Sequence, residues 1–282
     1  MAKKFAIVTG ASTGIGLELA RCCAKDGYDL LVAANEPAIE DAARAVIGVA
    51  LLNEAPGRSS RRSSGAEGGV SRPPAGYLET REALEQYGVR FPGAAAIRVG
   101  NDLTAAAAEL QAPFVLKADW IAHKTEHKAV AVGLPDADAA LSTFTEMSGR
   151  LGDGIYVLEE MDRRDGVVEL IVGARRDATF GIIVMVGLGG VQAELWRDTR
   201  IELGPVDQDT ARAMIDSLRC RPLLDGWRGA PAADVDSLVD TIVAVSQYLA
   251  EAPETCTEVE LNPVRVGPQG TLAVDALVVS AG

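Results

Sequence analysis

Apolar and polar positions divide the chain into two patterned parts. In the first part, an apolar run from Phe5 to Val8 precedes a glycine-rich turn and then apolar residues at the spacing of one helical face. A second apolar run over residues 28–37 is followed by a helical pattern over residues 38–46. This order predicts a short β-α-β-α fragment within residues 1–52.

Residues 53–76 separate the two patterned parts. Of these 24 residues, 17 are Gly, Ser, Pro or Arg, and Val70 is the single large aliphatic residue. Such a composition buries too little apolar surface to offset the entropy lost on ordering. We therefore predict a flexible, solvated linker, with a phosphate-binding patch of arginines as the alternative.

The second patterned part begins at Tyr77. Helical spacing occurs in residues 80–88, 102–110 and 235–249. Apolar runs bounded by turn residues predict strands at residues 94–99, 113–118, 154–161, 167–176, 180–187, 256–266 and 271–279. We expect a mixed α/β (α+β) domain with its own core over residues 77–282.

Composition and charge narrow the class of protein. The 282 residues are 48% apolar and 24% charged, as in ordinary globular domains. A net charge of −13 argues against a nucleic-acid surface, although it leaves local sites for an anion such as ATP open. No apolar run approaches the roughly 20 residues of a membrane helix, and the N-terminus does not read as a signal peptide. Four cysteines without metal-type spacing indicate reduced thiols in a cytoplasm.

The glycines at Gly10, Gly14 and Gly16 lie between the first predicted strand and helix, where backbone N–H groups can hold a pyrophosphate. This spacing resembles the short-chain dehydrogenase/reductase family. Asn35 stands where that family selects its cofactor, and this residue favours neither NAD nor NADP. The family also needs a lysine four residues after a catalytic tyrosine, and none of the five tyrosines has one. We interpret the glycines as a vestigial dinucleotide loop and expect NAD(P) to bind weakly.

Candidate anion-binding residues lie in the second part. Lys117 ends an apolar run, where its charge is costly unless it meets an anion, and phosphate is the natural candidate. Gly187, Gly189 and Gly190 follow a buried-type strand and would let the backbone approach a ligand. The alternatives are an exposed lysine at a strand end and a plain tight turn.

Candidate metal ligands lie near the C-terminus. Glu258, Glu260 and Asn262 alternate along one predicted strand and therefore share a face, and Asp275 lies on the next predicted strand. Oxygen ligands from neighbouring strands suit Mg²⁺ that bridges phosphates. A solvated acidic face is the alternative.

The motifs of the second part together resemble a known family. They are similar to the ATP-grasp domain of the ADP-forming (NDP-forming) acyl-CoA synthetases, over roughly residues 77–279. The similar motifs, in order, are PFVLK, HKTEHKAVAVGL, VELIVGARRDATFGIIVMVGLGGVQAEL, LLDGWRG and VELNPVRVGPQGTLAVDA. The resemblance implies an ATP-grasp fold preceded by the partial Rossmann-like β-α-β-α fragment.

The resemblance also implies a nucleotide site. It implies that Lys117 contacts the ATP phosphates and that Glu169 approaches the ribose. It also implies that the loop from Gly187 to Gly190 borders the phosphates. It assigns the adenine hinge to Glu159, Glu160 and Met161. It implies that Asn262 and Asp275 hold Mg²⁺, with Glu260 nearby.

Both histidines lie in one motif, at His123 and His127. The resemblance implies that His123 relays a phosphoryl group, and a neutral imidazole is a competent nucleophile near pH 7. We assign no role to His127. A zinc pair would fit the spacing, but no third ligand is apparent.

Related synthetases also contain CoA-binding and ligase domains, whose motifs do not occur in this sequence. We expect ATP and Mg²⁺ to bind here, and a CoA-binding/ligase partner subunit to supply CoA and the small carboxylic acid. Two other interpretations stay open. One is a catalytically incomplete, nucleotide-binding fusion protein, and the other is a reductase-type NAD(P)-binding protein.

Overall fold

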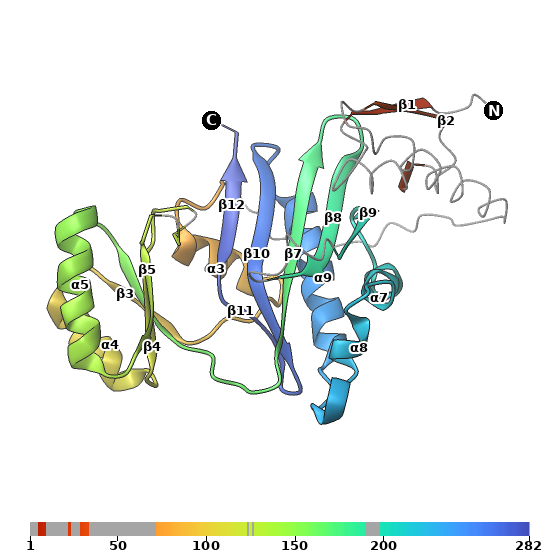
Figure 1. The fold of residues 1–282 in the computed structure, drawn as a ribbon. Coiled ribbons are helices and arrows are strands. Elements are labelled where there is room, and N and C mark those ends of the chain that lie inside the picture. Colours follow the sequence, from red (N-terminus) through yellow and green to blue (C-terminus); the bar gives the residue numbers. More distant parts are fainter. Residues whose placement is uncertain are drawn as a thin grey trace.

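Two antiparallel sheets that face each other make up most of the structure (Figure 1). This computed structural model describes residues 5–9, 22–23, 29–33, 72–122, 124–125, 127–189 and 198–281. Within them, no helix combines the length and the apolar character that crossing a bilayer requires. The two sheets, together with the helices that pack on them, confirm the mixed α/β class predicted for the second part.

The first sheet has four strands in the order β3-β6-β4-β5. Their bounds are Ala94–Ile97 (β3), Phe114–Ala118 (β4), Val130–Leu134 (β5) and Tyr156–Glu160 (β6). Helices α4 (Gly100–Glu109) and α5 (Ala137–Leu151) pack on its outer face (Figure 1). Phe114, Leu116 and Leu158 belong to the core beneath these helices. Because side chains alternate along a strand, Lys117 and Glu159 project from the opposite face, toward the second sheet.

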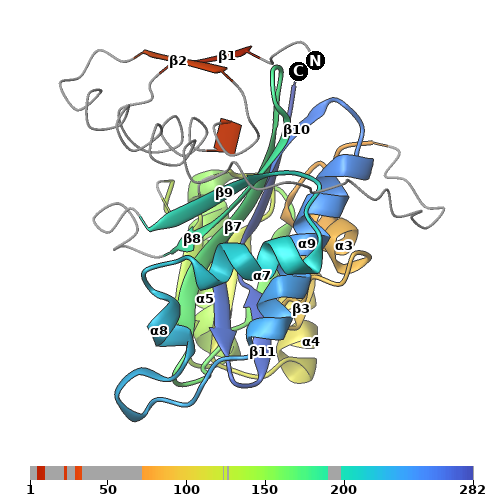
Figure 2. The ribbon, with the colours of Figure 1, turned by 90° about the vertical axis from the view of Figure 1, so that its right-hand side faces the viewer.

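The second sheet has six strands, with β11-β10-β7-β8-β9 in order and β12 also beside β10. Their bounds are Val168–Asp177 (β7), Gly181–Leu188 (β8), Thr199–Leu203 (β9), Cys256–Gly267 (β10), Gly270–Ala273 (β11) and Ala276–Ser280 (β12). Helices α7 (Gln208–Asp216) and α9 (Val235–Glu251) cover the face away from the first sheet (Figure 2). The short helices α8 (Arg221–Leu224) and η1 (Trp227–Gly229) follow α7. The apolar stripe predicted for residues 235–249 is confirmed, since Leu238, Ile242, Val245 and Leu249 are fully buried.

The last predicted strand, residues 271–279, proves to be two strands. β11 ends at Ala273 and β12 begins at Ala276, so Asp275 lies in the connection between strands and its expected place on a strand is wrong. The break lies opposite a bulge at Asn262 in β10, where β10 has one more residue than β7. The backbone N–H of Asn262 donates to the carbonyl of Asp275 (3.2 Å), so the bulge and the break face each other.

Two chain segments join the first sheet to the rest of the domain, one from a helix and one to the second sheet, and they lie side by side. Residues 88–93 lead from α3 (Tyr77–Glu85) into β3, and residues 161–167 lead from β6 into β7. The N–H of Glu160 donates to the carbonyl of Gly93 (2.8 Å). The guanidinium of Arg164 donates to the carboxylate of Asp162 and to the carbonyls of Arg265 and Gly270, at 2.8 to 3.0 Å.

These contacts also set the charge of Asp162. Burial alone would raise its pKa, but the hydrogen bonds and charge of Arg164, with the charge of Arg265, lower it below the usual value. The carboxylate is therefore ionised at neutral pH and ties residue 162 to the β10–β11 hairpin.

In the first part, β1 (Phe5–Thr9) and β2 (Asp29–Ala33) form a parallel pair in the expected order. Cys22 is buried, and its thiol donates to the carbonyl of Ile201 in β9 (2.9 Å). No disulfide joins the chain's four cysteines, all of which are buried. The predicted second helix and residues 53–71 of the predicted linker lie outside the described residues.

Candidate functional site

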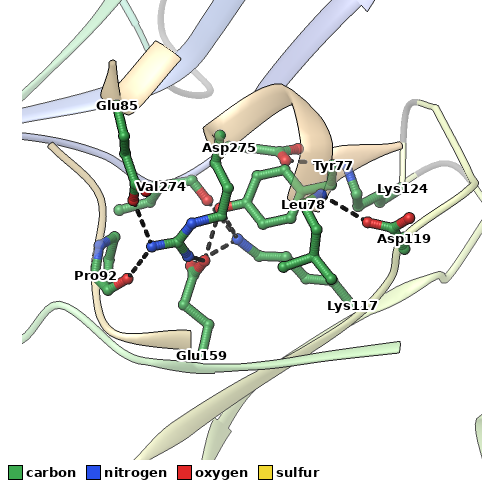
Figure 3. Close-up of polar contacts among 11 residues, drawn as sticks. Tyr77, Leu78, Glu85, Pro92, Lys117, Asp119, Lys124, Glu159, Val274 and Asp275 are labelled. Atoms are coloured by element: carbon green, nitrogen blue, oxygen red, sulfur yellow. Dashed lines mark hydrogen bonds and ion pairs between the residues drawn. The ribbon is translucent and has the colours of Figure 1, made fainter. Parts of the chain in front are cut away.

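The ammonium of Lys117 lies between the two sheets and is almost fully buried (Figure 3). Its Nζ donates to Glu159 Oε1 (2.7 Å), to the carbonyl of Val274 (2.6 Å) and to the hydroxyl of Tyr77 (3.2 Å). The sequence predicted that this charge must meet an anion. In the structure that anion is a carboxylate from the neighbouring strand.

The side chain of Glu159 is 1% exposed, so its charge depends on its partners. Its Oε2 accepts a hydrogen bond from the Tyr77 hydroxyl (2.6 Å) and one from Nη1 of Arg81 (3.3 Å). Burial first, and then the charge of Glu159, raises the pKa of Tyr77 well above its usual value. The phenol therefore stays protonated and acts as a donor to the carboxylate.

A second lysine, Lys124, reaches the same region from the segment that follows β4. Its Nζ pairs with Asp275 Oδ1 at 3.0 Å. The ring of Tyr77 lies near both ammonium groups, with its centroid 4.3 Å from the Nζ of Lys117 and 4.9 Å from that of Lys124. Tyr77 thus connects the two lysines.

The predicted metal ligands line one cavity of about 180 Å³. Glu260, Asn262 and Asp275 share it with Lys124 and Thr125. The bulge in β10 and the break before β12 bring these side chains together, and Asn262 Nδ2 donates to Glu260 Oε1 (3.2 Å). Two carboxylates and an amide oxygen are a donor set that fits Mg²⁺. Across the described residues, no cluster of three His, Cys, Asp or Glu side chains offers a different metal site.

The residues of the predicted adenine hinge point in two different directions. Glu159 points into the Lys117 group, whereas Glu160 and Met161 line a separate cavity of about 320 Å³ at the segments that connect the sheets. Glu160 Oε1 accepts from the N–H of Gln111 (2.8 Å), and the N–H of Met161 donates to the carbonyl of Pro113 (2.9 Å).

Glu169, the predicted ribose ligand, lies on β7 opposite Arg265 of β10. Its side chain is 44% exposed, and its Oε1 is 3.6 Å from Nε of Arg265. That Nε is buried without a hydrogen-bond partner among the described residues. The carboxylate does not belong to the group around Lys117.

The predicted glycine loop has a packing explanation. A Cβ on Gly187 would lie 2.8 Å from the carbonyl oxygen of Asp198, and one on Gly189 would lie 2.7 Å from the carbonyl carbon of Leu170. Both glycines therefore allow close contact between neighbouring strands, whatever they do for a ligand.

Several predicted residues lie outside the described part of the chain. They are His123, Gly190 and the three glycines of the predicted dinucleotide loop, Gly10, Gly14 and Gly16. Lys124 and Thr125 follow His123 directly, so the chain next to the predicted relay histidine borders the cavity of the predicted metal ligands.

Sequence reasoning missed Tyr77 and Arg81. Part of the signal was available, because Arg81 and Glu85 lie four residues apart within the predicted helix of residues 80–88. In the structure this helix begins at Tyr77, which places the phenol on the same face. Nothing in the sequence says that this face meets Lys117, 40 residues away in the chain.

The chain resembles curated proteins that differ in length. It is 29% identical to the beta subunit of acetate–CoA ligase [ADP-forming] I from Pyrococcus furiosus, over 71% of this chain and 89% of that subunit. It is 32% identical to trans-feruloyl-CoA synthase from an unknown prokaryotic organism, over 71% of this chain. The match spans only 29% of that longer protein.

Among solved structures, it resembles the dinucleotide-forming acetyl-coenzyme A synthetase 1 of Ca. Korarchaeum cryptofilum. The complex of that protein with coenzyme A and Ca-AMPCP gives a TM-score of 0.67 at 29% identity, over 73% of this chain and 93% of that one. Its complex with coenzyme A and Mg-AMPPCP, whose phosphohistidine segment points towards the nucleotide binding site, gives 0.63 at 28%, over 73% and 93%.

The sequence model of an ATP-grasp domain matches residues 75–279, which is nearly all of the part that forms the two facing sheets. The lysine between the sheets and the acidic cavity beside it lie within this match. The chain therefore belongs to the ATP-grasp family.

Proposed function

We propose that the chain is the ATP-binding subunit of an ADP-forming acyl-CoA synthetase. The observation that carries this proposal is the cavity in which Lys124 and Thr125, next to His123, meet Glu260, Asn262 and Asp275. A phosphoryl acceptor on this segment would lie beside the residues that suit a metal-bound triphosphate.

In the proposed reaction, a ring nitrogen of neutral His123 attacks the γ-phosphorus of ATP. A P–N bond forms, the bond to the β,γ-bridging oxygen breaks, and ADP leaves. Lys117 would hold the phosphates, and the hinge of Glu159, Glu160 and Met161 would border the adenine. Glu169 would contact the ribose, and the loop from Gly187 to Gly190 would border the phosphates.

Glu260, Asn262 and Asp275 would hold Mg²⁺, which supplies neutralisation of phosphate charge. Phosphoryl transfer depends mainly on positioning and charge, and these side chains sit where Lys124 already brings a positive charge.

We propose that a second polypeptide with CoA-binding and ligase functions takes the phosphoryl group from His123. The similarity to a subunit named beta, over 89% of its length, supports a division of the reaction between chains. The partner would then activate a small carboxylic acid and join it to CoA.

The test uses ATP labelled in the γ-phosphate, with a partner that carries the ligase domains. We expect acid-labile label on the wild-type chain. His123→Ala should abolish label and acyl-CoA formation and should leave MgATP binding nearly unchanged. His127→Ala is the matched control, because the His127 carbonyl accepts from Arg150 of α5 (3.2 Å), and its effect should be mild. Full activity of His123→Ala would refute the relay.

A further inference from the structure

Two side chains contact the ammonium of Lys117 in the interior of the molecule, Glu159 from β6 and Tyr77 from the first turn of α3 (Figure 3). Arg81, from the next turn of α3, contacts Glu159 and completes this group. The proposed function gives Lys117 a role but leaves the purpose of this group unexplained.

We infer that Glu159 is the positioning residue that fixes Lys117 for the nucleotide phosphates, and that Tyr77 and Arg81 hold the Glu159 carboxylate in place. This inference rests on the proposed function and assigns roles to residues that do not themselves touch the reacting atoms.

The hydrogen-bond inventory supports the assignment. An ammonium has three N–H donors, and all three of Lys117 are used, by Glu159, Val274 and Tyr77. A phosphate oxygen can bind this ammonium only by replacing one acceptor. The carbonyl of Val274 is the one to be replaced, because it belongs to the connection between β11 and β12, beside Asp275, whereas the Tyr77 hydroxyl is held by Glu159.

Glu159 would keep its bond to Lys117 during this exchange. Its second oxygen is held by the Tyr77 hydroxyl at 2.6 Å and by Arg81 at 3.3 Å, so moving the carboxylate would break three contacts. Arg81 is itself fixed by the carbonyl of Pro92 (2.8 Å) and by Glu85 (2.9 Å).

The distribution of charge agrees with this role. Arg81 compensates part of the Glu159 charge, which leaves positive charge on Lys117 for a ligand. A lysine has a long, flexible stem, and fixing its ammonium before binding removes an ordering cost that the nucleotide would otherwise meet. The group therefore preorganises one contact of the nucleotide site.

The test is a double-mutant cycle on the full chain, with the affinity for MgATP measured by calorimetry. Glu159→Gln should weaken binding about tenfold or more, as removal of an orienting partner does at comparable sites. In a Lys117→Met background, the same substitution should cost little, because the group that it positions is gone. A merely structural role would instead add its loss to that of Lys117→Met.

Two further variants complete the experiment. Glu85→Gln removes the exposed carboxylate on Arg81 and should leave the affinity within about twofold. Tyr77→Phe keeps the ring near both lysines but removes the hydroxyl, so we expect a loss of a few-fold. If Glu159→Gln does not fold, the affinity of Tyr77→Phe tests the positioning role.

The outcomes separate the two proposals. Wild-type affinity in folded Glu159→Gln or in Tyr77→Phe, or additive losses in the cycle, would overturn the positioning role alone. A wild-type chain that binds no MgATP would overturn the proposed function, and the positioning role with it.

Discussion

At the scale of single residues, Lys117 shows how an expectation from sequence is refined by structure. A buried lysine after an apolar run needs an anion, and the structure supplies Glu159 at 2.7 Å. The need was therefore predictable from local chemistry. The identity of the partner was not, because it depends on β4 pairing with β6, which places Lys117 opposite Val157.

The carboxylate of Asp275 leads to a prediction at the same scale. It pairs with Lys124 and lines the cavity with Glu260 and Asn262. If these groups hold Mg²⁺, Asp275→Asn should weaken MgATP binding by about tenfold or more while the fold survives. Calorimetry at fixed Mg²⁺ measures the affinity, and circular dichroism reports the fold.

Asp225→Asn serves as the control for that change. Asp225 also pairs with a cation, Arg221, but does so at an exposed site outside the cavity. Its loss should leave MgATP affinity unchanged. Equal affinities for wild type and Asp275→Asn would show that the acidic residues form a solvated face and do not hold Mg²⁺.

At the scale of elements, the pattern of apolar residues gave the strands and the long helix α9. It did not indicate β5 and β9, in which few side chains are buried, or α5 and α7, in which only three side chains each are buried. It also merged β11 with β12. Residues 271–279 read as one apolar run in the sequence, and only the structure shows that the strand breaks at Asp275, opposite the bulge at Asn262.

The glycines after β8 lead to a prediction about stability. Gly189→Ala would place a Cβ 2.7 Å from the backbone of Leu170, which cannot move without disturbing β7. We expect the free energy of unfolding to fall by about 1–3 kcal/mol, as for other overpacked sites. Urea unfolding, followed by circular dichroism, measures the change.

Gly149→Ala is the matched control, because Gly149 lies in α5 and a Cβ there meets nothing within 4 Å. Alanine is the better helix former, so this variant should be as stable as wild type or up to about 1 kcal/mol more stable. A Gly189→Ala chain as stable as Gly149→Ala would show that the strands separate easily at this point.

At the scale of the whole molecule, the chain combines a family-matched part, residues 75–279, with a preceding part that contains the parallel pair β1–β2. The two parts meet where Cys22 bonds to β9. Sequence patterns predicted this division into two parts. They could not identify this contact, because a thiol and a backbone carbonyl 179 residues apart have no local signature.

The two nucleotide-binding patterns make a prediction for the full chain. MgATP should bind with a dissociation constant between about 1 μM and 1 mM, or about −8 to −4 kcal/mol, and NADH and NADPH should bind far more weakly. The reason is that the acidic cavity and Lys117 are assembled, whereas the predicted reductase-like part is only a partial Rossmann-like fragment with Asn35 at the position that selects the cofactor. Calorimetry with each ligand separately decides the matter, and tight NADH binding without ATP binding would contradict it.

The two connecting segments, residues 88–93 and 161–167, have a mechanical consequence. Both leave the first sheet together, and Arg164 fastens one of them to the β10–β11 hairpin at Gly270. If the sheets turn about an axis near these segments, displacement grows with distance from that axis. Val274 lies four residues further along, roughly 13 Å away in an extended strand. A small rotation would therefore stretch the bond between Val274 and Lys117 while the contacts of Arg164 hold, so the motion is concentrated where the phosphates would enter.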